Sequence, residues 1–276
     1  MRFDGKVALV SGAGSGIGRA TARGFAARGA QVAVADIDRA KSEAVTAEIV
    51  GSGGKALAIV ADAGDPAGID AMIRGTVDAF GGLDILHNNA FGQPPLPPGQ
   101  TRLKFTGDIE EQVWAHIINL GLTGVFRATK RAIPELLKRG GGAIVNTASI
   151  SGLFGDFAIG AYNAAKAGVV NLTRVTAIEY AARGIRVNCI CPGAIDTPLL
   201  RPSLSIPGFA EATNAAIPMR AAGQARGDGQ CRPVPRVGSC LVRHGGGGRR
   251  RWRPHGPDRV AVANSRSLTA GSPGLR

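Results

Sequence analysis

The apolar positions of this 276-residue chain fall into short continuous runs that take turns with longer, periodic segments. Continuous runs rich in Val, Ile, Leu and Ala are typical of strands buried on both faces of a parallel sheet. They predict strands at residues 6–11, 31–36, 55–61, 83–88, 143–149 and 185–190. The segments between them have helical periodicity and predict helices at residues 16–28, 40–50, 66–80, 109–138 and 161–182. Pro134, inside the fourth of these helices, predicts a kink or a break there.

Repeated strand–helix units predict an α/β fold, a Rossmann-like doubly wound parallel sheet with right-handed crossovers. Ligands of such folds bind beyond the carboxyl ends of the strands. We therefore expect one nucleotide-binding domain at residues 1–224, with a substrate loop at about 191–222. Residues 225–276 lack this periodicity and form a separate tail that is rich in Arg, Gly and Pro.

The composition disfavours several classes of protein. A hydrophobic content of 44% is that of a globular protein, and no apolar stretch reaches the length of a membrane span. The four cysteines have neither a zinc-binding spacing nor a disulfide framework. Cys189 and Cys191 alternate along a predicted strand, as core residues do; the other two are Cys231 and Cys240. We therefore expect no metal site and a reducing, cytoplasmic location.

Glycines crowd the junction between the first predicted strand and the first predicted helix. They let the turn close and let a pyrophosphate approach the backbone, while the helix N-terminus offers N–H groups and a partial positive charge. A glycine-rich turn without a ligand is the alternative, but strand, turn and helix follow in the order that a dinucleotide site requires. The candidate cofactor residues in this segment are Gly12, Ser15, Gly16, Ile17 and Gly18.

Two aspartates end the second and third predicted strands. Asp36 is placed to accept hydrogen bonds from ribose hydroxyls, and its charge would repel the 2′-phosphate of NADP. No Arg follows it at once, so the sequence favours NAD over NADP. Asp62, followed by Ala63, is a candidate for the adenine end of the cofactor. The alternatives are a helix N-cap for Asp36 and an N-cap or turn residue for Asp62.

A third group of residues has the chemistry of proton transfer: Tyr162, Lys166 and, thirteen residues before the tyrosine, Ser149. Tyr162 and Lys166 are four residues apart and share one face of a helix. A nearby ammonium lowers the pKa of a phenol. To reach neutrality the pKa must shift by roughly 3 units, which is about 4 kcal/mol. Pairs with this spacing also occur on solvated helices, so the pair alone does not establish catalysis.

With these motifs, residues 1 to about 224 resemble the short-chain dehydrogenase/reductase family. The matching elements are Gly12-x3-Gly16-x-Gly18, Asp62, Asn88-Asn89-Ala90, Asn119, Ser149, Tyr162-x3-Lys166 and Pro192-Gly193. The sequence departs from the family at Phe91, where Gly is usual, and at Ser11, where Thr is commoner. Neither departure is expected to affect the proton chemistry.

The resemblance implies a role for each matched residue. Tyr162 would be the general acid/base, and Lys166 would lower its pKa and hold the nicotinamide ribose. Ser149 would donate to the substrate oxygen, and Asn119 would support a water relay to Lys166. The alternatives are a strand cap for Ser149 and an ordinary polar helix residue for Asn119. Cofactor contacts are implied at Asn89, Ala90, Pro192, Gly193, Ile195 and Thr197, besides Tyr162 and Lys166. His87 is expected to be a packed core residue rather than a ligand.

The expected substrate site is apolar. Its candidate lining is Phe91, Leu153, Phe154, Phe157, Leu199, Leu200 and Phe209, with no Arg or Lys placed for a carboxylate. We therefore expect an NAD-dependent oxidoreductase that interconverts a secondary alcohol and a ketone, on an uncharged alicyclic, steroid-like or acyl substrate. The alternative is a catalytically silent NAD-binding protein with a defective C-terminus. The resemblance also implies a homotetramer or homodimer.

The C-terminal segment does not fit the family. Residues 225–276 hold 11 of the 33 basic residues and 2 of the 20 acidic ones, so most of the net charge of +13 lies there. When the tail is back-translated and the reading frame is shifted by one base, residues 225–244 permit the sequence PEEMANAVLFLASDLASYVT, and residues 249–252 permit Val-Asp-Gly-Gly. These shifted sequences would supply the last helix, the last strand and the C-terminal ending that are typical of the family. We expect an irregular, disordered tail or a change of reading frame near Gln224, and either would remove surface on which the implied oligomer is built. An Arg-rich segment that binds nucleic acid is the disfavoured alternative.

Overall fold

The computed structural model describes residues 2–94, 102–206, 208–217 and 220–225. Within these residues strands and helices alternate as predicted, and the α/β fold is confirmed. The predictions for the tail at residues 226–276, with its two cysteines, lie outside the described residues.

Six parallel strands form the central sheet in the order β3-β2-β1-β4-β5-β6. They are β1 (Val7–Ser11), β2 (Gln31–Asp36), β3 (Lys55–Val60), β4 (Ile85–Asn88), β5 (Gly142–Thr147) and β6 (Ile185–Ile190). Their order along the sheet reverses direction between β1 and β4. Ligands of doubly wound sheets bind at this switch point, beyond the carboxyl ends of the strands.

The helices between the strands are α1 (Gly16–Ala26), α2 (Arg39–Gly51), α3 (Pro66–Phe80), α4 (Glu111–Ile118), α5 (Gly124–Lys138) and α6 (Gly160–Tyr180). The long helix predicted at residues 109–138 is divided, but not at its proline. A π turn over Asn119–Thr123 joins α4 to α5, and α5 continues through Pro134 to Lys138. Of the kink or break predicted at Pro134, the break is therefore wrong, because α5 runs through the proline.

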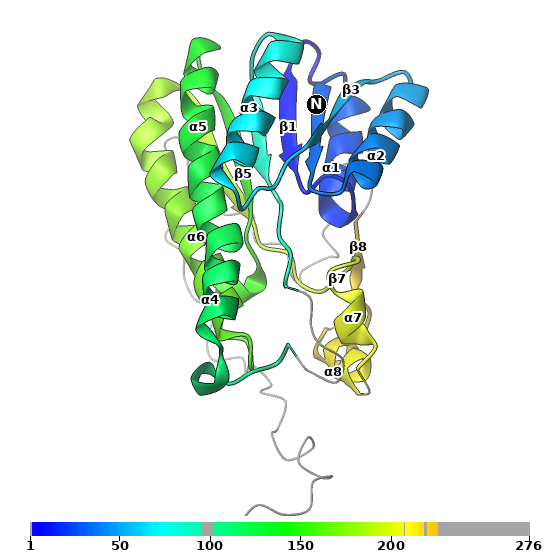
Figure 1. Ribbon diagram of the computed structural model, residues 1–276, viewed down its shortest axis with the longest axis vertical. Helices are drawn as coiled ribbons and strands as arrows, with labels where there is room; N and C mark the ends of the chain where they lie inside the picture. Colours follow the sequence, from blue (N-terminus) through cyan, green and yellow to red (C-terminus); the bar gives the residue numbers. More distant parts are fainter. Residues whose placement is uncertain (1, 95–101, 207, 218–219, 226–276) are drawn as a thin grey trace, which may run out of the picture.

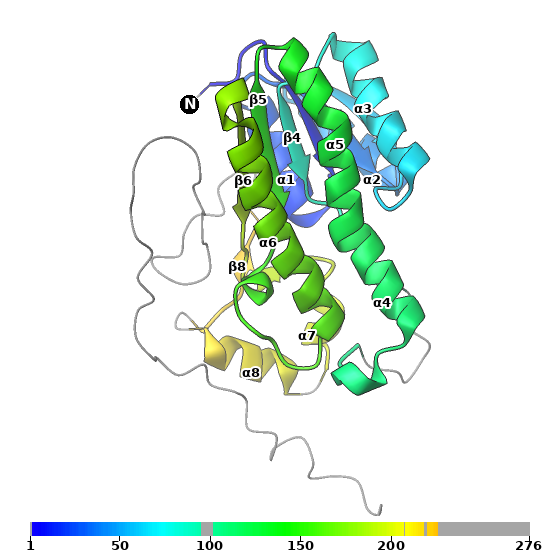
Figure 2. The same cartoon turned by 90° about the vertical axis from the view of Figure 1, so that its left-hand side faces the viewer.

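The helices form a layer on each face of the sheet (Figures 1 and 2). Neighbouring residues of β1 mark the two faces, since Leu9 packs in the core with α3 and α5, and Val10 in the core with α1 and α2. On the α6 side of β6, Cys189 is a buried core residue, as predicted. On the other side of β6 no described helix packs, and Arg186 is exposed. Burial on both faces therefore holds for β1 but not for β6.

The segment after β6 lies beyond the carboxyl ends of the strands (Figure 1). It contains two short parallel strands, β7 (Ile195–Asp196) and β8 (Gly223–Gln224), with α7 (Arg201–Leu204) and α8 (Phe209–Ala216) between them. Three single turns of 3-10 helix complete the described elements: η1 (Thr106–Asp108), η3 (Ile150–Gly152) and η4 (Ala181–Arg183). The predicted substrate loop thus lies at the ligand-binding end of the sheet.

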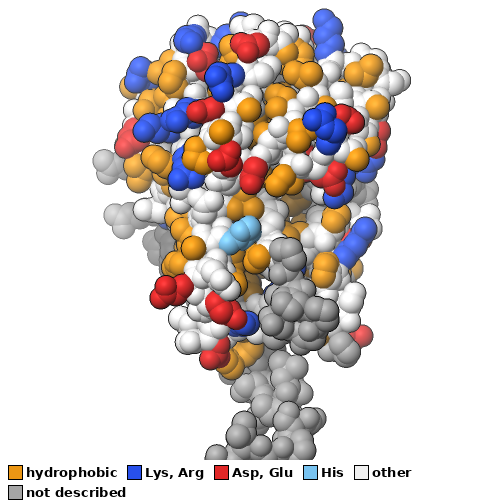
Figure 3. All heavy atoms as spheres, in the orientation of Figure 1, with side chains coloured by type: hydrophobic (Ala, Val, Ile, Leu, Met, Phe, Trp, Pro, Cys, Tyr) orange, Lys and Arg blue, Asp and Glu red, His pale blue; other side chains and the backbone are white. Residues whose placement is uncertain are grey.

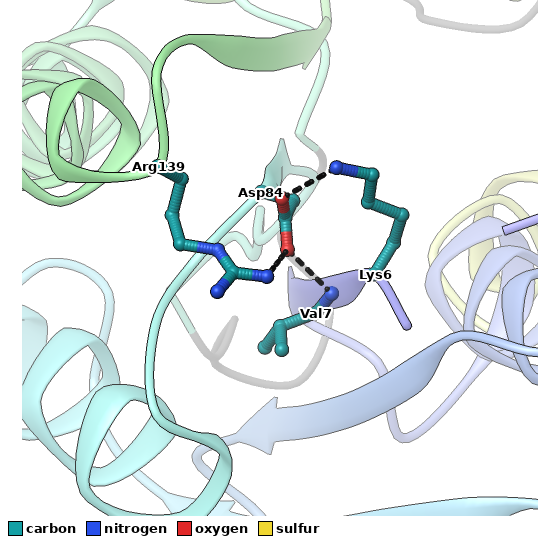
Figure 4. Close-up of polar contacts among 4 residues, drawn as sticks. All are labelled: Lys6, Val7, Asp84 and Arg139. Carbon is teal, nitrogen blue, oxygen red and sulfur yellow. Dashed lines mark hydrogen bonds and ion pairs between the residues drawn. The ribbon is translucent and has the colours of Figure 1, made fainter. Parts of the chain in front are cut away.

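A buried carboxylate ties three segments together at the opposite end of the sheet (Figure 4). Asp84 accepts hydrogen bonds from the Val7 N–H at 3.0 Å and from Lys6 Nζ at 2.9 Å. It also accepts one from the Arg139 guanidinium at 3.2 Å. Burial alone would raise the pKa of Asp84, but these three donors outweigh burial and hold the pKa below its ordinary value. The carboxylate thereby holds the start of β1 and the end of α5 beside β4.

The surface shown in Figure 3 mixes charges of both signs with apolar atoms. In the described part of the chain, no helix combines the length and the hydropathy that crossing a membrane requires. The same residues contain no group of three or more His, Cys, Asp or Glu side chains that could hold a metal ion.

Candidate active site

The glycine-rich turn between β1 and α1 closes because side chains are missing at the tightest points. Gly12 and Gly16 have φ angles of +62° and +50°, which other residues rarely adopt. A Cβ on Gly18 would lie 2.0 Å from the Gly12 carbonyl oxygen. Ser15 does not cap α1 through its side chain, and the first turn, which includes Ile17, carries no acidic residue. The N-terminal N–H groups of α1 therefore fit an anion such as a pyrophosphate.

Asp36 ends β2 beside this turn. One carboxylate oxygen accepts a hydrogen bond from the Gly14 N–H at 2.8 Å, and the other accepts one from the Asp38 N–H at 3.0 Å. The cap of α2 is Asp38, whose side chain accepts from the Lys41 N–H. The N-cap alternative for Asp36 is therefore wrong. Its carboxylate lies against the glycine turn with lone pairs left to accept from a ribose.

Asp62 follows β3 and holds a tight turn, because its Oδ1 accepts from the Gly64 N–H at 2.7 Å. The cap of α3 is Asp65. Of the alternatives for Asp62, the structure thus supports the turn residue and not the N-cap. A Cβ on Gly124 would lie 2.4 Å from the carbonyl of Ala63, so the turn is packed directly against α5.

Asn89 joins the glycine turn to β4. Its Nδ2 donates to the carbonyls of Ser11 and Gly12, both at 3.2 Å. The Ser11 hydroxyl accepts from the N–H groups of Asn89 and Ala90, both at 3.1 Å. Thr147 of β5 donates its hydroxyl proton to Asn89 Oδ1. The side chain of Asn89 therefore sets the position of the glycine turn relative to β4 and β5.

His87 lies in β4 next to this network and is 2% exposed, so it is the core residue that was predicted. Its Nε2 hydrogen-bonds the Thr147 hydroxyl at 2.9 Å. Because Thr147 gives its single proton to Asn89, Nε2 of His87 must be the donor here. His87 Nδ1 is buried without a hydrogen-bond partner among the described residues. Burial lowers the pKa of His87 to about 4, so the imidazole is neutral.

Tyr162, Lys166 and Ser149 come together at the carboxyl end of β5. Tyr162 and Lys166 lie one turn apart near the start of α6, and Ser149 caps the η3 turn. Ser149 faces the Tyr162 phenol and favours its ionised form. Lys166 Nζ is buried 5.7 Å from the centre of the tyrosine ring and donates to the Thr147 carbonyl at 2.8 Å. The structure thus brings three of the four predicted catalytic residues into one cluster, in which Ser149 and Lys166 are buried and Tyr162 is half-buried.

The protonation of this cluster differs from the expectation. Burial raises the pKa of Tyr162 above its ordinary value; the Ser149 hydrogen bond opposes this, and the negative charge of Asp156 adds to it. Burial also lowers the pKa of Lys166 to about 8. Desolvation therefore outweighs the attraction of the ammonium, which is engaged with the Thr147 carbonyl. The protein groups alone do not lower the phenol pKa toward neutrality.

Asn119 is the predicted catalytic residue that the structure does not bring to the cluster. Its Nδ2 donates to the Gly64 carbonyl at 2.9 Å, and its Oδ1 accepts from Arg127 at 3.1 Å. Both ends of the amide are thus engaged at the turn after β3. Two residues of the π turn face α6: a Cβ on Gly121 would lie 3.3 Å from Ala165, and Leu122 would lie 2.7 Å from a Cβ on Gly168. In this structure Asn119 supports the turn after β3 and makes no contact with the lysine.

Phe91 fills the space beside Gly121, where a Cβ would lie 3.1 Å from the phenylalanine ring. The Phe91 ring meets the Tyr162 ring edge to face, with 5.1 Å between their centres. Lys166 Nζ lies 4.9 Å from the centre of the Phe91 ring, within the range of a cation–π contact. The departure from the family at Phe91 therefore touches both proton-transfer residues, contrary to the expectation.

The segment after β6 contacts both halves of the site. The Pro192 carbonyl accepts from the Ile150 N–H at 3.1 Å and so holds the η3 turn. Thr197 lies on the glycine turn, because its Cγ2 would be 3.1 Å from a Cβ on Gly16. Between them, Gly193 follows Pro192 directly, and Ile195 begins β7. The structure thus places the predicted Pro192 and Thr197 beside the serine and the glycine turn respectively.

The predicted substrate-site residues differ in exposure. Phe154, Phe157 and Leu199 are exposed, whereas Leu153 packs against the core cluster next to α6. Leu200 and Phe209 are half-buried. Phe105, which was not predicted, meets Phe157 edge to face with 5.4 Å between ring centres. Phe154 and Phe157 thus expose apolar side chains just before α6, and Leu199 exposes one just before α7.

Four residues that touch the catalytic cluster or its network were also not predicted: Thr147, Ser151, Asp156 and Gly121. Thr147 and Ser151 lie two residues on either side of Ser149, and that spacing is a usable signal. Asp156 and Gly121 carry no such signal, because their positions depend on how α4 and the η3–α6 segment pack.

A parallel sheet with an anion-binding turn at its switch point and a tyrosine–lysine–serine cluster defines a dinucleotide-dependent oxidoreductase. A family model described as short chain dehydrogenase matches residues 6–205. The chain belongs to this family, whose members bind NAD(H) or NADP(H), and the resemblance seen in the motifs is confirmed.

Curated relatives match over the same region. The cyclohexanol dehydrogenase of Acinetobacter sp. (strain SE19) is 42% identical over 201 residues, which cover 72% of this chain and 76% of that protein. The 2,5-dichloro-2,5-cyclohexadiene-1,4-diol dehydrogenase of Sphingobium indicum is 40% identical over 200 residues, which cover 72% of this chain and 76% of that protein.

Solved structures share the fold. A 7α-hydroxysteroid dehydrogenase complexed with NADH and 7-oxo glycochenodeoxycholic acid has a TM-score of 0.73 and 32% identity, over 81% of this chain and 84% of that chain. A Beutenbergia cavernae protein assigned as an NAD(P) dependent gluconate 5-dehydrogenase, with bound NADP, has a TM-score of 0.73 and 32% identity, over 81% and 86% of the two chains. Similar structures therefore include complexes with either cofactor.

Proposed function

We propose that this chain is an NAD-dependent dehydrogenase that interconverts an uncharged alicyclic secondary alcohol and its ketone. The observation that carries the proposal is the cluster of Tyr162, Lys166 and Ser149, in which Lys166 Nζ lies 5.7 Å from the centre of the Tyr162 ring and Ser149 faces the phenol. A phenol, a hydroxyl and an ammonium in one cluster can bind an alcohol oxygen and exchange a proton with it. The glycine turn at the carboxyl end of β1 supplies the place for a dinucleotide.

The nicotinamide, when bound, supplies the hydride chemistry. The glycine turn and the N-terminus of α1 would hold the pyrophosphate, and Asp36 would hold the adenosine ribose. Lys166 and Tyr162 would hold the nicotinamide ribose. These assignments rest on the donors and acceptors that the turn, β2 and α6 present.

The chain itself has to move one proton for each alcohol that is oxidised. Tyr162 accepts the hydroxyl proton of the alcohol and returns it to the ketone oxygen in the reverse direction. Ser149 binds the same substrate oxygen by donating its hydroxyl proton. The Lys166 ammonium, present below a pKa of about 8, stabilises the phenolate, and the Thr147 carbonyl holds it in place.

The choice of NAD over NADP is supported by charges at the end of β2. The Asp36 carboxylate would repel a 2′-phosphate. Lys41 is the cation next to the glycine turn, and its Nζ is paired with Asp38 at 2.7 Å. Asp36→Ala should therefore weaken NADH binding at least about tenfold, because hydrogen bonds to a charged group are lost, and should spare NADPH binding. Equal losses for both cofactors in fluorescence titrations would contradict the NAD assignment.

The alicyclic substrate class is supported by the exposed apolar side chains of Phe154, Phe157 and Leu199 and by two relatives whose names specify six-membered rings. A panel of secondary alcohols tests this class. Cyclohexanol-like alcohols should give higher kcat/KM than small 2-hydroxy acids, whose carboxylates find no partner among the exposed apolar side chains. Faster turnover of the hydroxy acids would show that the substrate class is wrong.

Tyr162→Phe tests the reaction itself. This variant should lower kcat about 10²–10⁴-fold, the usual contribution of a general acid/base, and weaken NADH binding far less, because the glycine turn, Asp36 and Lys166 remain. Tyr180→Phe, at the other tyrosine of the chain, is the matched control and should keep wild-type turnover. Turnover near the wild-type rate in Tyr162→Phe would refute the assignment. NADH binding without any turnover in the wild type would instead favour the catalytically silent alternative.

The cytoplasmic location, the homo-oligomer and the change of reading frame near Gln224 stay predictions. Sequencing the coding DNA tests the last of these. A clean read without a homologous shifted frame would contradict it.

A further inference from the structure

An exposed carboxylate, that of Asp156, lies close to Ser149, the serine that binds the substrate oxygen in the function proposed above. Ser149 Oγ lies 3.2 Å from Ser151 Oγ, and Ser151 Oγ donates to Asp156 Oδ2 at 2.7 Å. These two contacts keep Asp156 Oδ2 within about 6 Å of Ser149 Oγ. Both serines are buried, whereas Asp156 is exposed. A six-membered ring held at Ser149 by one oxygen therefore has the carboxylate within reach of a second substituent.

This arrangement leaves the Ser149 proton available for the substrate oxygen. The Ser151 N–H donates to Ser149 Oγ at 3.2 Å, and the Ser151 hydroxyl gives its own proton to Asp156. Ser149 Oγ is thus held in place as an acceptor. Its O–H can turn from Ser151 to a bound alcohol without breaking the contact that positions Asp156.

The Asp156 carboxylate is not needed to fix its own loop. Asn163, in the first turn of α6, accepts from the Asp156 N–H and donates to the Asp156 carbonyl, both at 3.1 Å. Ser151 binds one carboxylate oxygen, Oδ2. In the part of the chain that the structure describes, no donor is bonded to the other oxygen, Oδ1. Asp156 therefore has a fixed position and an oxygen that can accept a hydrogen bond from a ligand.

The surroundings of Asp156 are apolar and lack a neutralising cation. Phe154 and Phe157, on either side of it in the chain, are exposed. None of the ion pairs among the described residues involves Asp156. Its negative charge also reaches the phenol, since it contributes to the raised pKa of Tyr162. A ligand at this place meets an apolar surface with one negatively charged acceptor.

We propose that Asp156 is a specificity-determining residue that accepts a hydrogen bond from a second hydroxyl of the substrate. The proposal rests on the function proposed above and narrows its substrate class from alicyclic alcohols to alicyclic diols. One hydroxyl is bound at Ser149 and Tyr162 and is oxidised, and the other donates to Asp156 and stays a hydroxyl. A carboxylate in place of the second hydroxyl is repelled by the same charge. Ser151 positions Asp156 for this contact.

The test compares kcat/KM for cyclohexanol with kcat/KM for the separate cis and trans isomers of cyclohexane-1,3-diol and cyclohexane-1,4-diol, with NAD and the full-length chain. At least one diol should exceed cyclohexanol at least about tenfold, because it adds a hydrogen bond to a charged group. Asp156→Ala should lower this ratio to about two, the statistical advantage of two equivalent hydroxyls. The ratio is taken within one protein, so the effect of the Asp156 charge on Tyr162 cancels. Asp78→Ala, which removes an exposed carboxylate on α3, is the control and should keep the wild-type ratio.

A second pair of substrates isolates the charge. Asp156→Asn keeps the size of the side chain and removes the charge. It should raise kcat/KM for 4-hydroxycyclohexanecarboxylate relative to its amide about five- to tenfold over the wild-type ratio. This measurement decides the question if Asp156→Ala is inactive towards both alcohols.

Three results would overturn the role of Asp156 and leave the proposed function intact, provided that cyclohexanol is oxidised. They are a wild type that prefers no diol, equal diol preference in the wild type and Asp156→Ala, and an unchanged carboxylate-to-amide ratio in Asp156→Asn. A wild-type chain that oxidises none of these alcohols would instead overturn the proposed function, and the role of Asp156 with it.

Discussion

His87 should make the stability of this protein depend on pH in a way that one substitution removes. The imidazole is 2% exposed, donates from Nε2 to Thr147, and leaves Nδ1 buried without a partner in the described part of the chain. A second proton would place a charge and an unpaired N–H in the core. Burial therefore lowers the pKa of His87 from 6.5 to about 4.

The size of the effect follows from these two pKa values. The unfolded chain binds the proton more readily than the folded chain, so stability that is present above pH 6.5 is lost as the pH falls toward 4. Between pH 7.5 and pH 5.0 the imidazole becomes almost fully protonated in the unfolded chain and stays neutral in the folded one. At about 1.4 kcal/mol per unit of pKa difference, the loss over this interval is about 2 kcal/mol.

His87→Gln and His87→Phe remove the titration and keep a side chain of similar size. Urea unfolding followed by tryptophan fluorescence gives the free energy of unfolding at the two pH values. The wild type should lose about 2 kcal/mol more than either variant. Taking the difference between proteins cancels the titration of all other groups. Equal losses in the three proteins would refute the argument that His87 is buried as a neutral group.

Three further predictions concern packing, the cofactor turn and the lysine. Asp84→Ala leaves a buried backbone N–H of β1 without an acceptor and should lower the free energy of unfolding by about 2 kcal/mol in urea titrations. The control is Asp4→Ala, which removes an exposed, paired carboxylate and should cost far less. Similar losses in the two variants would contradict this prediction. Gly18→Ala places a Cβ 2.0 Å from a carbonyl oxygen of the glycine turn and should weaken NADH binding at least about tenfold. Gly51→Ala, with open space around its Cβ, should leave NADH binding unchanged in the same fluorescence titration, and an equal effect of the two variants would count against the steric argument. Phe91→Leu keeps the lysine buried but removes the ring that stabilises its ammonium, so the lysine pKa should fall below about 8. The alkaline limb of the kcat/KM profile should then move down by roughly half to one pH unit, and a limb at the wild-type position would show that the ring contributes nothing.

The strands and the glycine turn were predictable from the sequence because their signals are local. The continuous apolar run that ends at Ser11 and the glycines that follow it require only the conformations of neighbouring residues. The six strands accordingly lie within two residues of their predicted positions. Asp36 was also predictable, because its place at the end of β2 puts it at the ligand-binding edge of any doubly wound sheet.

The irregular helix was not predictable. Pro134 is a visible signal for interruption, yet α5 continues through it, and the interruption lies at the π turn over Asn119–Thr123. That turn places Gly121 against α6 and Asn119 against the turn after β3. Which of its residues faces the lysine depends on the packing of α4, and no local pattern in the sequence encodes that packing.

By itself the sequence determined the order of strands and helices, the glycine turn and the candidate proton-transfer residues, because each of these depends on residues close together in the chain. The tertiary structure alone decided the surroundings of those residues: the Phe91 ring beside Lys166, the neutral His87 next to Asn89, and Asn119 at the turn after β3. Burial and hydrogen-bond partners arise only when distant segments pack together. They set the pKa of each group, and so desolvation raises the phenol pKa that the Tyr–Lys spacing alone would lower.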